Sequence, residues 1–277
     1  MYVIKASGET EKFNVKKIER TCLRAGAPKE LAKKIAKEVK RRAYDGITTR
    51  EILHITLTLL RKEEPHIASR YDLKGALLRL GPAGFTFENL ISEILKEYGY
   101  SIKLRSIVRG FCVSHEIDII ATKNGKNFMI ECKYHNFPGV YTGLKETLYT
   151  YARFLDLKEA WKKGFCRKFE GPWLICNTKF SEDAIKYANC REIKLIGWNY
   201  PSAGNLKDLI ENRKLYPITI LRSLDKDSQL KLAKVGLVLA LDLIRVNLKE
   251  LRHITKIPLK KLKVLVKEAS GICKVNG

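Results

Sequence analysis

The chain has 277 residues, which is long enough for two or three domains that each bury a core. Its 53 Lys and Arg residues against 30 Asp and Glu give a formal net charge of +23, as is usual for a protein with a polyanionic partner such as nucleic acid. The seven cysteines have no C-x-x-C spacing, which argues against a zinc site or a disulfide framework. Without a signal-peptide pattern or an apolar run of membrane-spanning length, we expect a soluble, cytoplasmic protein with no membrane partner.

Residues 1–83 are predicted to form a short strand at 2–5 and four amphipathic helices, at about 15–25, 29–44, 48–61 and 65–80. Thr48 or Thr49 is a suitable N-cap for the third helix, with Glu51 in its first turn. This layout resembles the ATP-cone, a nucleotide-sensing domain of ribonucleotide reductases and of their transcriptional repressor. The residues that carry the resemblance are 3–9, Glu11, Phe13, 17–18, 46–49 and 68–71.

The ATP-cone resemblance implies that ATP or dATP binds in this domain as a regulatory ligand. Matched position by position, it implies the binding residues Val3, Lys5, Glu11, Phe13, Asn14, Lys17, Ile18 and Thr49. The family usually has Arg-Asp after the strand lysine, and this chain has Ala6-Ser7. The alternative is a helical domain kept for packing or dimerisation. No G-x-x-x-x-G-K-[ST] loop occurs, so ATP hydrolysis by a P-loop is not supported.

Residues 84–200 read as helix, three strands, helix, strand, helix and strand. The first helix, at about 85–98, has apolar residues at helical spacing. A strand at 101–112 and a hairpin of two strands at 116–133 are followed by a helix at about 142–162. A strand at 173–176, a helix at 181–188 and a strand at 193–197 complete the segment.

The most informative stretch lies at 115–133, where Asn124-Gly125 separates two strand-like runs. Asn-Gly is a strong signal for a two-residue type I′ hairpin turn, because both central residues need a positive φ. That turn predicts Asp118 opposite Glu131 and Glu116 opposite Lys133, all on one face. The other face is predicted to be apolar and to comprise Ile117, Ile119, Ala121, Phe128, Ile130 and Cys132.

Two carboxylates placed opposite one another create an electrostatic problem. At about 5 Å and an effective dielectric constant near 20, they repel by roughly 3 kcal/mol. Two carboxylates and an adjacent backbone carbonyl suit a hard divalent cation such as Mg²⁺ (or Mn²⁺). The alternative is a solvated polar hairpin face, because Glu-X-Lys is common on strands.

Asp118 followed by Glu131-Cys132-Lys133 resembles the PD-(D/E)XK nuclease superfamily, and Phe87-Glu88 resembles its Mrr-type branch. The resemblance implies Asp118, Glu131, Lys133 and Glu88 as catalytic residues. It implies Asp118, Glu131 and the Cys132 carbonyl as metal ligands. The alternative for Glu88 is a carboxylate favoured by the helix dipole. Mrr-type enzymes often have a glutamine after the lysine, and here Thr147, Leu148, Tyr151 and Arg153 occupy that region.

Residues 201–277 are basic and predicted to be helical, with a linker at 201–204 and helices at about 206–210, 228–246, 248–254 and 259–270. The last two resemble the helix-hairpin-helix modules of archaeal recombinases, which bind the DNA backbone. Thr255 or Lys256 replaces the usual hairpin glycine, and Lys256, Lys260, Lys261 and Lys263 are available for phosphate contacts. The alternative is a small packing or dimerisation bundle.

The sequence therefore predicts a multi-domain α+β protein: an ATP-cone at 1–83, a nuclease-like core with a mixed sheet at 84–200 and a helix-hairpin-helix-like domain at 201–277. We expect a Mg²⁺-dependent DNA endonuclease regulated by an adenine nucleotide. The alternative is a non-catalytic, nucleotide-regulated nucleic-acid-binding protein. RNA as the substrate stays open, and a homodimer is expected because one site per chain must cut two strands.

Overall fold

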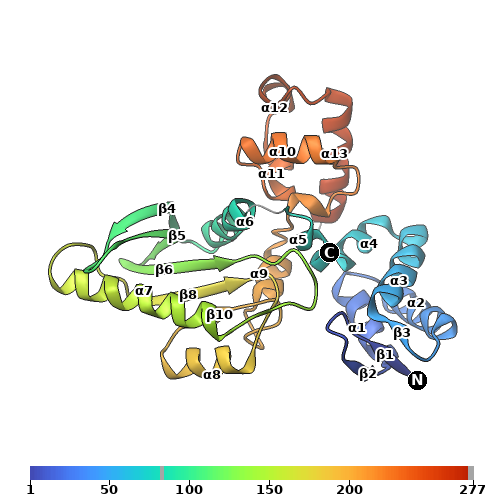
Figure 1. The fold of residues 1–277 in the computed structure, drawn as a ribbon. Coiled ribbons are helices and arrows are strands. Elements are labelled where there is room, and N and C mark those ends of the chain that lie inside the picture. The colour runs from blue at the N-terminus through green and yellow to red at the C-terminus, as the bar shows by residue number, and fades with distance from the viewer. Residues whose placement is uncertain (82–83, 274–277) are drawn as a thin grey trace. The chain divides into compact units, whose positions relative to one another are not determined.

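The computed structural model describes residues 1–81 and 84–273. It divides into two compact units, one of residues 1–79 with 216–277 and a central one of residues 80–215 (Figure 1). Helices and mixed sheets together confirm the predicted multi-domain α+β class. The expected boundary at residue 83 falls on 82–83, outside the described residues.

The N-terminal part of the first unit is a small sheet covered by helices. The sheet has the order β2-β1-β3, with β1 (Tyr2–Ile4) antiparallel to β2 (Thr10–Lys12) and parallel to β3 (Ile47–Thr48). The helices are α1 (Val15–Arg24), α2 (Lys29–Arg42), α3 (Thr49–Glu63), α4 (Pro65–Tyr71) and α5 (Leu73–Leu78). The single helix predicted at 65–80 is wrong, because the chain leaves helical geometry at Asp72 between α4 and α5.

Side-chain caps fix where α1 and α3 begin. Asn14 accepts a hydrogen bond from the Lys16 N–H at 3.0 Å, which satisfies one free amide of the first turn of α1. Thr48 and Glu51 form the predicted capping box on α3. The Glu51 N–H donates to Thr48 Oγ1 at 3.1 Å and the Thr48 N–H donates to Glu51 Oε2 at 2.9 Å. Strand β3 and helix α3 are thereby joined without a loop.

The C-terminal helices belong to the same unit. They are η1 (Ile218–Ile220), α10 (Lys226–Lys234), α11 (Ala240–Arg245), α12 (Leu248–Thr255) and α13 (Leu259–Cys273). The single helix predicted at 228–246 is wrong, since Gly236 has φ +79° and breaks it between α10 and α11. Lys256, between α12 and α13, adopts the left-handed conformation (φ +58°) that a hairpin glycine would otherwise supply.

Arg70 and Thr219 fasten these C-terminal helices to the N-terminal part. Arg70, on α4, donates to the Ala25 carbonyl at 2.7 Å and to the Ile272 carbonyl at 3.2 Å. The buried Thr219 hydroxyl donates to the Ala76 carbonyl at 2.6 Å. One arginine therefore connects the end of α1 to the last turn of α13.

The central unit is built on a five-stranded sheet of order β10-β8-β6-β5-β4. The strands are β4 (Ser101–Arg109), β5 (Ser114–Lys123), β6 (Lys126–Lys133), β8 (Gly171–Cys176) and β10 (Lys194–Ile196). β4, β5 and β6 are antiparallel neighbours, whereas β6, β8 and β10 run parallel. The helices are α6 (Gly84–Glu97), α7 (Leu144–Lys162), α8 (Glu182–Cys190) and α9 (Leu206–Arg213), and β7 (Tyr141–Thr142) with β9 (Lys179–Phe180) forms a two-stranded sheet.

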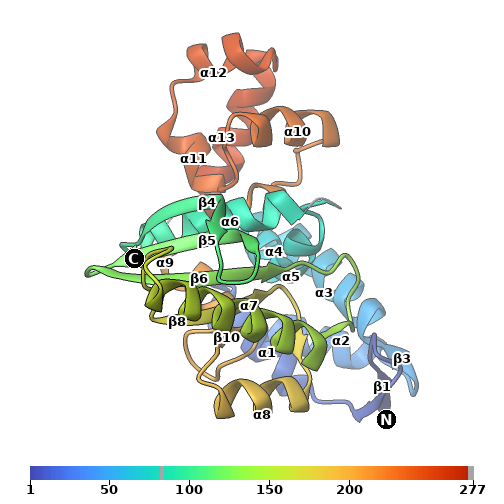
Figure 2. The same cartoon turned by 60° about the vertical axis from the view of Figure 1, so that its left-hand side comes forward.

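Helices pack against both faces of this sheet. Ile117, Ile120 and Met129 form a buried cluster with Phe154 and Leu157 of α7, the long helix drawn beside the strands in Figures 1 and 2. Because successive strand residues point to opposite faces, Ile130 faces away from α7. Helix α6 packs on β4, β5 and β6, and its Phe87 and Leu90 are fully buried. Helix α9 is tied to this unit by the Leu206 N–H, which donates to the Gly197 carbonyl at 2.9 Å.

The predicted hairpin turn is confirmed, but the predicted register holds for only part of it. Asn124 and Gly125 both have positive φ, and β5 pairs with β6 from Lys123 opposite Lys126 to Ile119 opposite Ile130. The ladder ends there, so the predicted pairs of Asp118 with Glu131 and of Glu116 with Lys133 are wrong.

The β5–β6 ladder ends next to an irregularity in β4 and β5. Arg105 has φ +44° in the middle of β4, at the position opposite Asp118, where both strands lack a paired residue. Ile117 then faces the same cluster as Ile120, so the strict alternation predicted for residues 117–121 is wrong at Ile117. A left-handed residue inside a strand costs roughly 1–3 kcal/mol and is most often found at functional sites.

Removing the Phe87 side chain should destabilise the central unit strongly. Phe87 is fully buried, and a Phe→Ala change in a core costs about 3–5 kcal/mol through lost transfer energy and a cavity. Urea unfolding followed by tryptophan fluorescence measures this, because Trp161, Trp173 and Trp198 all lie in this unit. The matched control is Ile107→Ala, at a side chain that is 77% exposed, and an equal loss in both variants would contradict this packing.

Candidate active site and nucleotide pocket

Charged side chains from α6, β4, β5, β6 and α7 meet where β5 and β6 separate. The acidic members are Glu88 of α6, Asp118 of β5 and Glu131 of β6, with Glu116 of β5 nearby. The charge of Asp118 affects the ionisation of both Glu88 and Glu131, and the charge of Glu88 affects that of Glu131. The basic members are Arg105 of β4, Lys133 of β6 and Arg153 of α7. The four residues predicted as catalytic, Glu88, Asp118, Glu131 and Lys133, are thus brought together.

Asp118 holds the end of the β5–β6 pair in place. Its carboxylate accepts the Cys132 N–H at 2.7 Å, so a side chain takes the place of a ladder hydrogen bond. Burial raises the pKa of Asp118, while this hydrogen bond acts in the opposite direction. The interaction brings the Asp118 carboxylate next to the backbone of the Glu131-Cys132 segment.

Glu131 has the most strongly shifted carboxyl group of the cluster. Burial, and then the charge of Asp118, raise the pKa of Glu131 to about 7, although Arg153 acts to lower it. Burial also raises the pKa of the Cys132 thiol well above its usual value, so the Cys132 side chain stays neutral. Only the backbone carbonyl of Cys132 is therefore suited to a hard cation.

Glu88 is held by the left-handed Arg105. Arg105 Nη1 donates to Glu88 Oε2 at 3.1 Å and to Asn89 Oδ1 at 3.2 Å. Burial, followed by the charge of Asp118, raises the pKa of Glu88, and the Arg105 hydrogen bond opposes that rise. The unusual backbone of Arg105 thus coincides with a contact to an acidic residue of the site.

Arg153 is central to the cluster. The sequence showed only that it lies in the region where a glutamine was expected and is absent. Its Nη1 donates to Glu131 Oε2 and its Nη2 donates to the Glu116 carbonyl. The side chain is 8% exposed, and its Nε has no hydrogen-bond partner among the described residues. The spacing of Arg153 on α7 gave no signal for this, because its partners lie 22 and 37 residues earlier in the chain.

The donor set fits a magnesium-like ion. Among the described residues no group of three His, Cys, Asp or Glu side chains could hold a metal. The Asp118 carboxylate contacts the Cys132 backbone N–H and acts on the ionisation of Glu131, and Mg²⁺ is typically held by one or two carboxylates while it keeps several waters. Burial raises the pKa of both carboxyl groups, and the charge of Asp118 adds to the rise at Glu131, so a bound cation would stabilise their ionised forms.

A second site lies in the first unit, in a pocket of about 290 Å³ between the small sheet and helices α1, α3 and α4. All eight residues predicted to bind a nucleotide line it: Val3, Lys5, Glu11, Phe13, Asn14, Lys17, Ile18 and Thr49. Lys12, Thr21, Ile52 and Tyr71 also line it and were not predicted. Helical spacing could have found two of them, since Thr21 follows Lys17 by one turn and Ile52 follows Thr49 by one turn.

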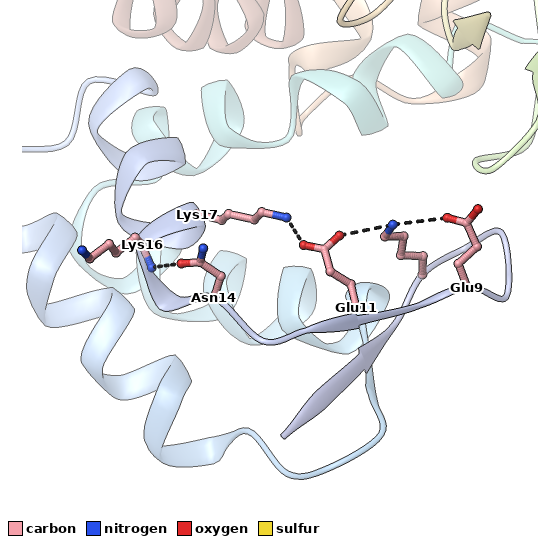
Figure 3. A network of polar contacts seen from close by, with 6 residues as sticks. Glu9, Glu11, Asn14, Lys16 and Lys17 are labelled. Carbon is pink, nitrogen blue, oxygen red and sulfur yellow. Dashed lines mark hydrogen bonds and ion pairs between the residues drawn. The ribbon is translucent and has the colours of Figure 1, made fainter. Parts of the chain in front are cut away.

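Glu11 bridges Lys5 and Lys17, two of the three lysines that line this pocket (Figure 3). Lys5 Nζ lies 3.2 Å from Glu11 Oε2 and 3.2 Å from Glu9 Oε2, and Lys17 Nζ pairs with Glu11 Oε1. Lys5 directly follows β1 and Lys17 lies in α1, so Glu11 holds two cations from different parts of the chain at one wall of the pocket. An apolar wall is supplied by Val3, Phe13 and Ile18.

Comparisons with known proteins divide the chain into three matched segments. The ATP cone domain matches residues 1–73, the restriction endonuclease domain matches 82–199, and the AF1548-like C-terminal domain matches 216–273. The fold and the acidic hairpin site define this as an ATP-cone joined to an Mrr-type, restriction-endonuclease-like domain, as the sequence predicted. These matches indicate a nuclease-type domain joined to a nucleotide-binding type of domain.

This chain matches two relatives over nearly the whole of their length. A protein of Archaeoglobus fulgidus, itself described only as uncharacterized, is 46% identical over 182 residues, which is 66% of this chain and 99% of the relative. A crystal structure of AF1548, described as a protein of unknown function, superposes with a TM-score of 0.60 at 42% identity and covers 69% of this chain and 98% of that one. The chain belongs to the AF1548-like family. In residues 1–81 and 84–273, no helix is both long and apolar enough to cross a membrane.

The ionisation of Glu131 should make the metal-free protein less stable as the pH rises. Its pKa in the folded state is about 7 against 4.5 as the ordinary value, so the folded state holds the proton more tightly between these values. The free energy of unfolding of the central unit therefore falls from about pH 4.5 to pH 7 in EDTA, and Glu131→Gln removes that part of the slope. Tryptophan-detected urea unfolding at several pH values tests this. The exposed Asp183→Asn serves as the control, and identical slopes for wild type and Glu131→Gln would refute the assignment.

Proposed function

We propose that this protein is a Mg²⁺-dependent (or Mn²⁺-dependent) DNA endonuclease that binds ATP or dATP at its N-terminal domain as a regulatory ligand. The hydrogen bond from the Cys132 N–H to Asp118 is the observation that supports this most directly. It brings the Asp118 carboxylate beside the backbone of the Glu131-Cys132 segment, with Lys133 one residue further along.

The proposed roles follow from the position of each residue. Asp118, Glu131 and the Cys132 carbonyl hold the ion. When bound, Mg²⁺ polarises the scissile phosphate and lowers the pKa of a coordinated water. Lys133 positions the water or neutralises charge that develops on the phosphate oxygens. Glu88, held by Arg105, orients water at the edge of the site.

The partner is proposed to be DNA. The net charge of +23 favours a polyanion, and backbone contacts through lysines give affinity that depends steeply on salt but carries little sequence information. Exposed lysines of the C-terminal helices, Lys256, Lys260 and Lys263, are candidates for such contacts. Lys261 is instead paired with Asp225. A homodimer would supply two sites for two strands.

The rival function is a non-catalytic, nucleotide-regulated nucleic-acid-binding protein. Its specific support is Arg153, because an arginine on Glu131 supplies the positive charge that a metal would otherwise bring. The presence of Asp118, Glu131 and Lys133 together argues for catalysis.

Supercoiled plasmid should be nicked in the presence of Mg²⁺ or Mn²⁺ and not in EDTA. Asp118→Asn and Lys133→Ala should each lower the rate at least about a hundredfold, because one removes a metal ligand and the other a charge at the reacting phosphate. Gel analysis of nicked and linear product over time measures this. Asp183→Asn and Lys186→Ala, at exposed positions on α8, are the matched controls.

Retained metal-dependent nicking in Asp118→Asn would show that the active site lies elsewhere. Intact DNA binding with no cleavage by wild type would favour the rival.

ATP or dATP should bind to the N-terminal pocket through Lys5 and Lys17. Lys5→Ala or Lys17→Ala should weaken binding about tenfold each, equivalent to about 1.4 kcal/mol, through loss of a phosphate contact. Titration calorimetry of the full chain with each nucleotide measures this. Lys33→Ala, at an exposed lysine of α2 outside the pocket, is the control. A loss in Lys5→Ala no larger than in the control would exclude Lys5 as a phosphate ligand.

A further inference from the structure

Arg153 is unusually placed for an arginine. It lies in the middle of α7, among the buried Thr147, Thr150, Phe154 and Leu157, and its own side chain is 8% exposed. Arginine is almost never buried to this extent unless it is paired. Its location therefore needs a specific electrostatic reason.

The reason lies in its two guanidinium contacts. Nη1 donates to Glu131 Oε2 on β6 and Nη2 donates to the Glu116 carbonyl on β5, so the group bridges the strands where their ladder ends. Nε is buried and has no hydrogen-bond partner among the described residues. Each terminal nitrogen thus donates one hydrogen bond within the site, and the Nε–H, one of the five guanidinium donors, has no acceptor among the described residues.

Arg153 offsets part of the negative charge of the cluster. Glu88, Asp118, Glu131 and the neighbouring Glu116 supply four negative charges when ionised, against three positive charges from Arg105, Lys133 and Arg153. Arg105 is engaged with Glu88, which leaves Arg153 as the direct counter-ion of Glu131. A divalent cation that binds Glu131 competes with Arg153 for the same carboxylate and raises the net charge of the cluster by two.

We propose that Arg153 has two positions: it pairs with Glu131 when the metal is absent, and it contacts a phosphate of the bound nucleic acid when the metal is present. A guanidinium released from Glu131 presents a planar fork of N–H donors, which matches two phosphate oxygens better than a lysine does. The excess positive charge of the metal-loaded cluster favours a phosphodiester at the same place. This inference rests on the proposed function, because it assumes a metal at Asp118 and Glu131.

The simpler role, an arginine that only fastens α7 to the sheet, makes a different prediction. A fastening residue affects the stability of the fold and leaves metal and DNA affinities unchanged. An arginine that competes with the metal must weaken metal binding, so its removal must strengthen it. The two roles are separated by binding measurements rather than by activity.

The first test is calorimetric titration of the full chain with Mn²⁺. Arg153→Gln should bind Mn²⁺ about tenfold more tightly than wild type, because Glu131 has lost its competing partner. Arg105→Gln is the matched control: it removes one positive charge from the same cluster but from Glu88 rather than Glu131, so its effect should be clearly smaller. Arg153→Lys keeps the charge and loses the bridging geometry, and should fall between wild type and Arg153→Gln. Tryptophan fluorescence shows whether Arg153→Gln folds. If it does not, Arg153→Lys still provides the readout.

The second test measures affinity for a labelled DNA by fluorescence anisotropy, in EDTA and in Ca²⁺, the latter used as a probe ion. In EDTA wild type and Arg153→Gln should bind alike, since Arg153 is held by Glu131. Ca²⁺ should increase the affinity of wild type at least several-fold more than that of Arg153→Gln.

The outcomes separate this inference from the function on which it rests. Tighter Mn²⁺ binding in Arg153→Gln together with a smaller Ca²⁺-dependent gain in DNA affinity supports both positions of Arg153. Equal Mn²⁺ affinity in wild type, Arg153→Gln and Arg153→Lys overturns the inference and leaves the metal site intact. Absence of Mn²⁺ binding in wild type and in every variant overturns the proposed metal site itself. A tighter metal site with an unchanged DNA response overturns the phosphate position alone.

Discussion

The central unit depends on how three carboxyl groups are accommodated at one edge of a largely buried sheet. Glu88, Asp118 and Glu131 all have pKa values raised first by burial, and the charge of Asp118 adds to the rise at the other two. Such a cluster is costly unless each carboxylate finds a hydrogen bond or a counter-ion. Asp118 accepts a hydrogen bond from the Cys132 N–H, Glu88 pairs with Arg105 and Glu131 pairs with Arg153.

These three solutions also explain the local departures from regular structure. Arg105 has a left-handed backbone conformation inside β4, and the β5–β6 ladder ends before Asp118. The buried Arg153 of α7 donates to Glu131 on the sheet. Irregular backbone and buried ionic contacts cost stability, and such features persist where the site has another task to perform. A cation site is the task most consistent with an excess of carboxylate.

The sequence predicted the parts that local rules control. Asn124-Gly125 gave the turn and the register as far as Ile119 and Ile130, and Thr48 with Glu51 gave the cap of α3. The end of the ladder at Ile119 could not be predicted, because it coincides with an irregularity at Arg105 on a third strand and with a hydrogen bond from the Cys132 N–H to the Asp118 side chain in place of a backbone acceptor. Arg153 could not be assigned either, since no sequence spacing reveals which buried acid a helix in another layer will meet. The breaks at Asp72 and at Gly236 show that amphipathic periodicity continues through interruptions of the helix itself.

In the first unit, the residues taken from the ATP-cone resemblance all line one pocket, whereas composition alone gave no reason to select Lys5 or Glu11. Glu11 pairs with Lys5 and Lys17 in this pocket, and Arg153 pairs with Glu131 in the central unit. In both sites a residue of opposite charge neutralises the candidate ligand-binding group. Arg70 ties the end of α1, a helix of that pocket, to the C-terminal helix α13. The AF1548-like C-terminal segment is thus a structural continuation of the nucleotide-binding part.

The claim that the acidic edge of the central sheet is a metal site is tested most directly by anomalous diffraction from crystals of the full chain soaked in Mn²⁺. The account predicts a manganese peak within coordination distance of the Asp118 and Glu131 carboxylates and the Cys132 carbonyl, with the Arg153 guanidinium displaced from Glu131. Soaked crystals with no peak at this place, and with Arg153 still on Glu131, would contradict it.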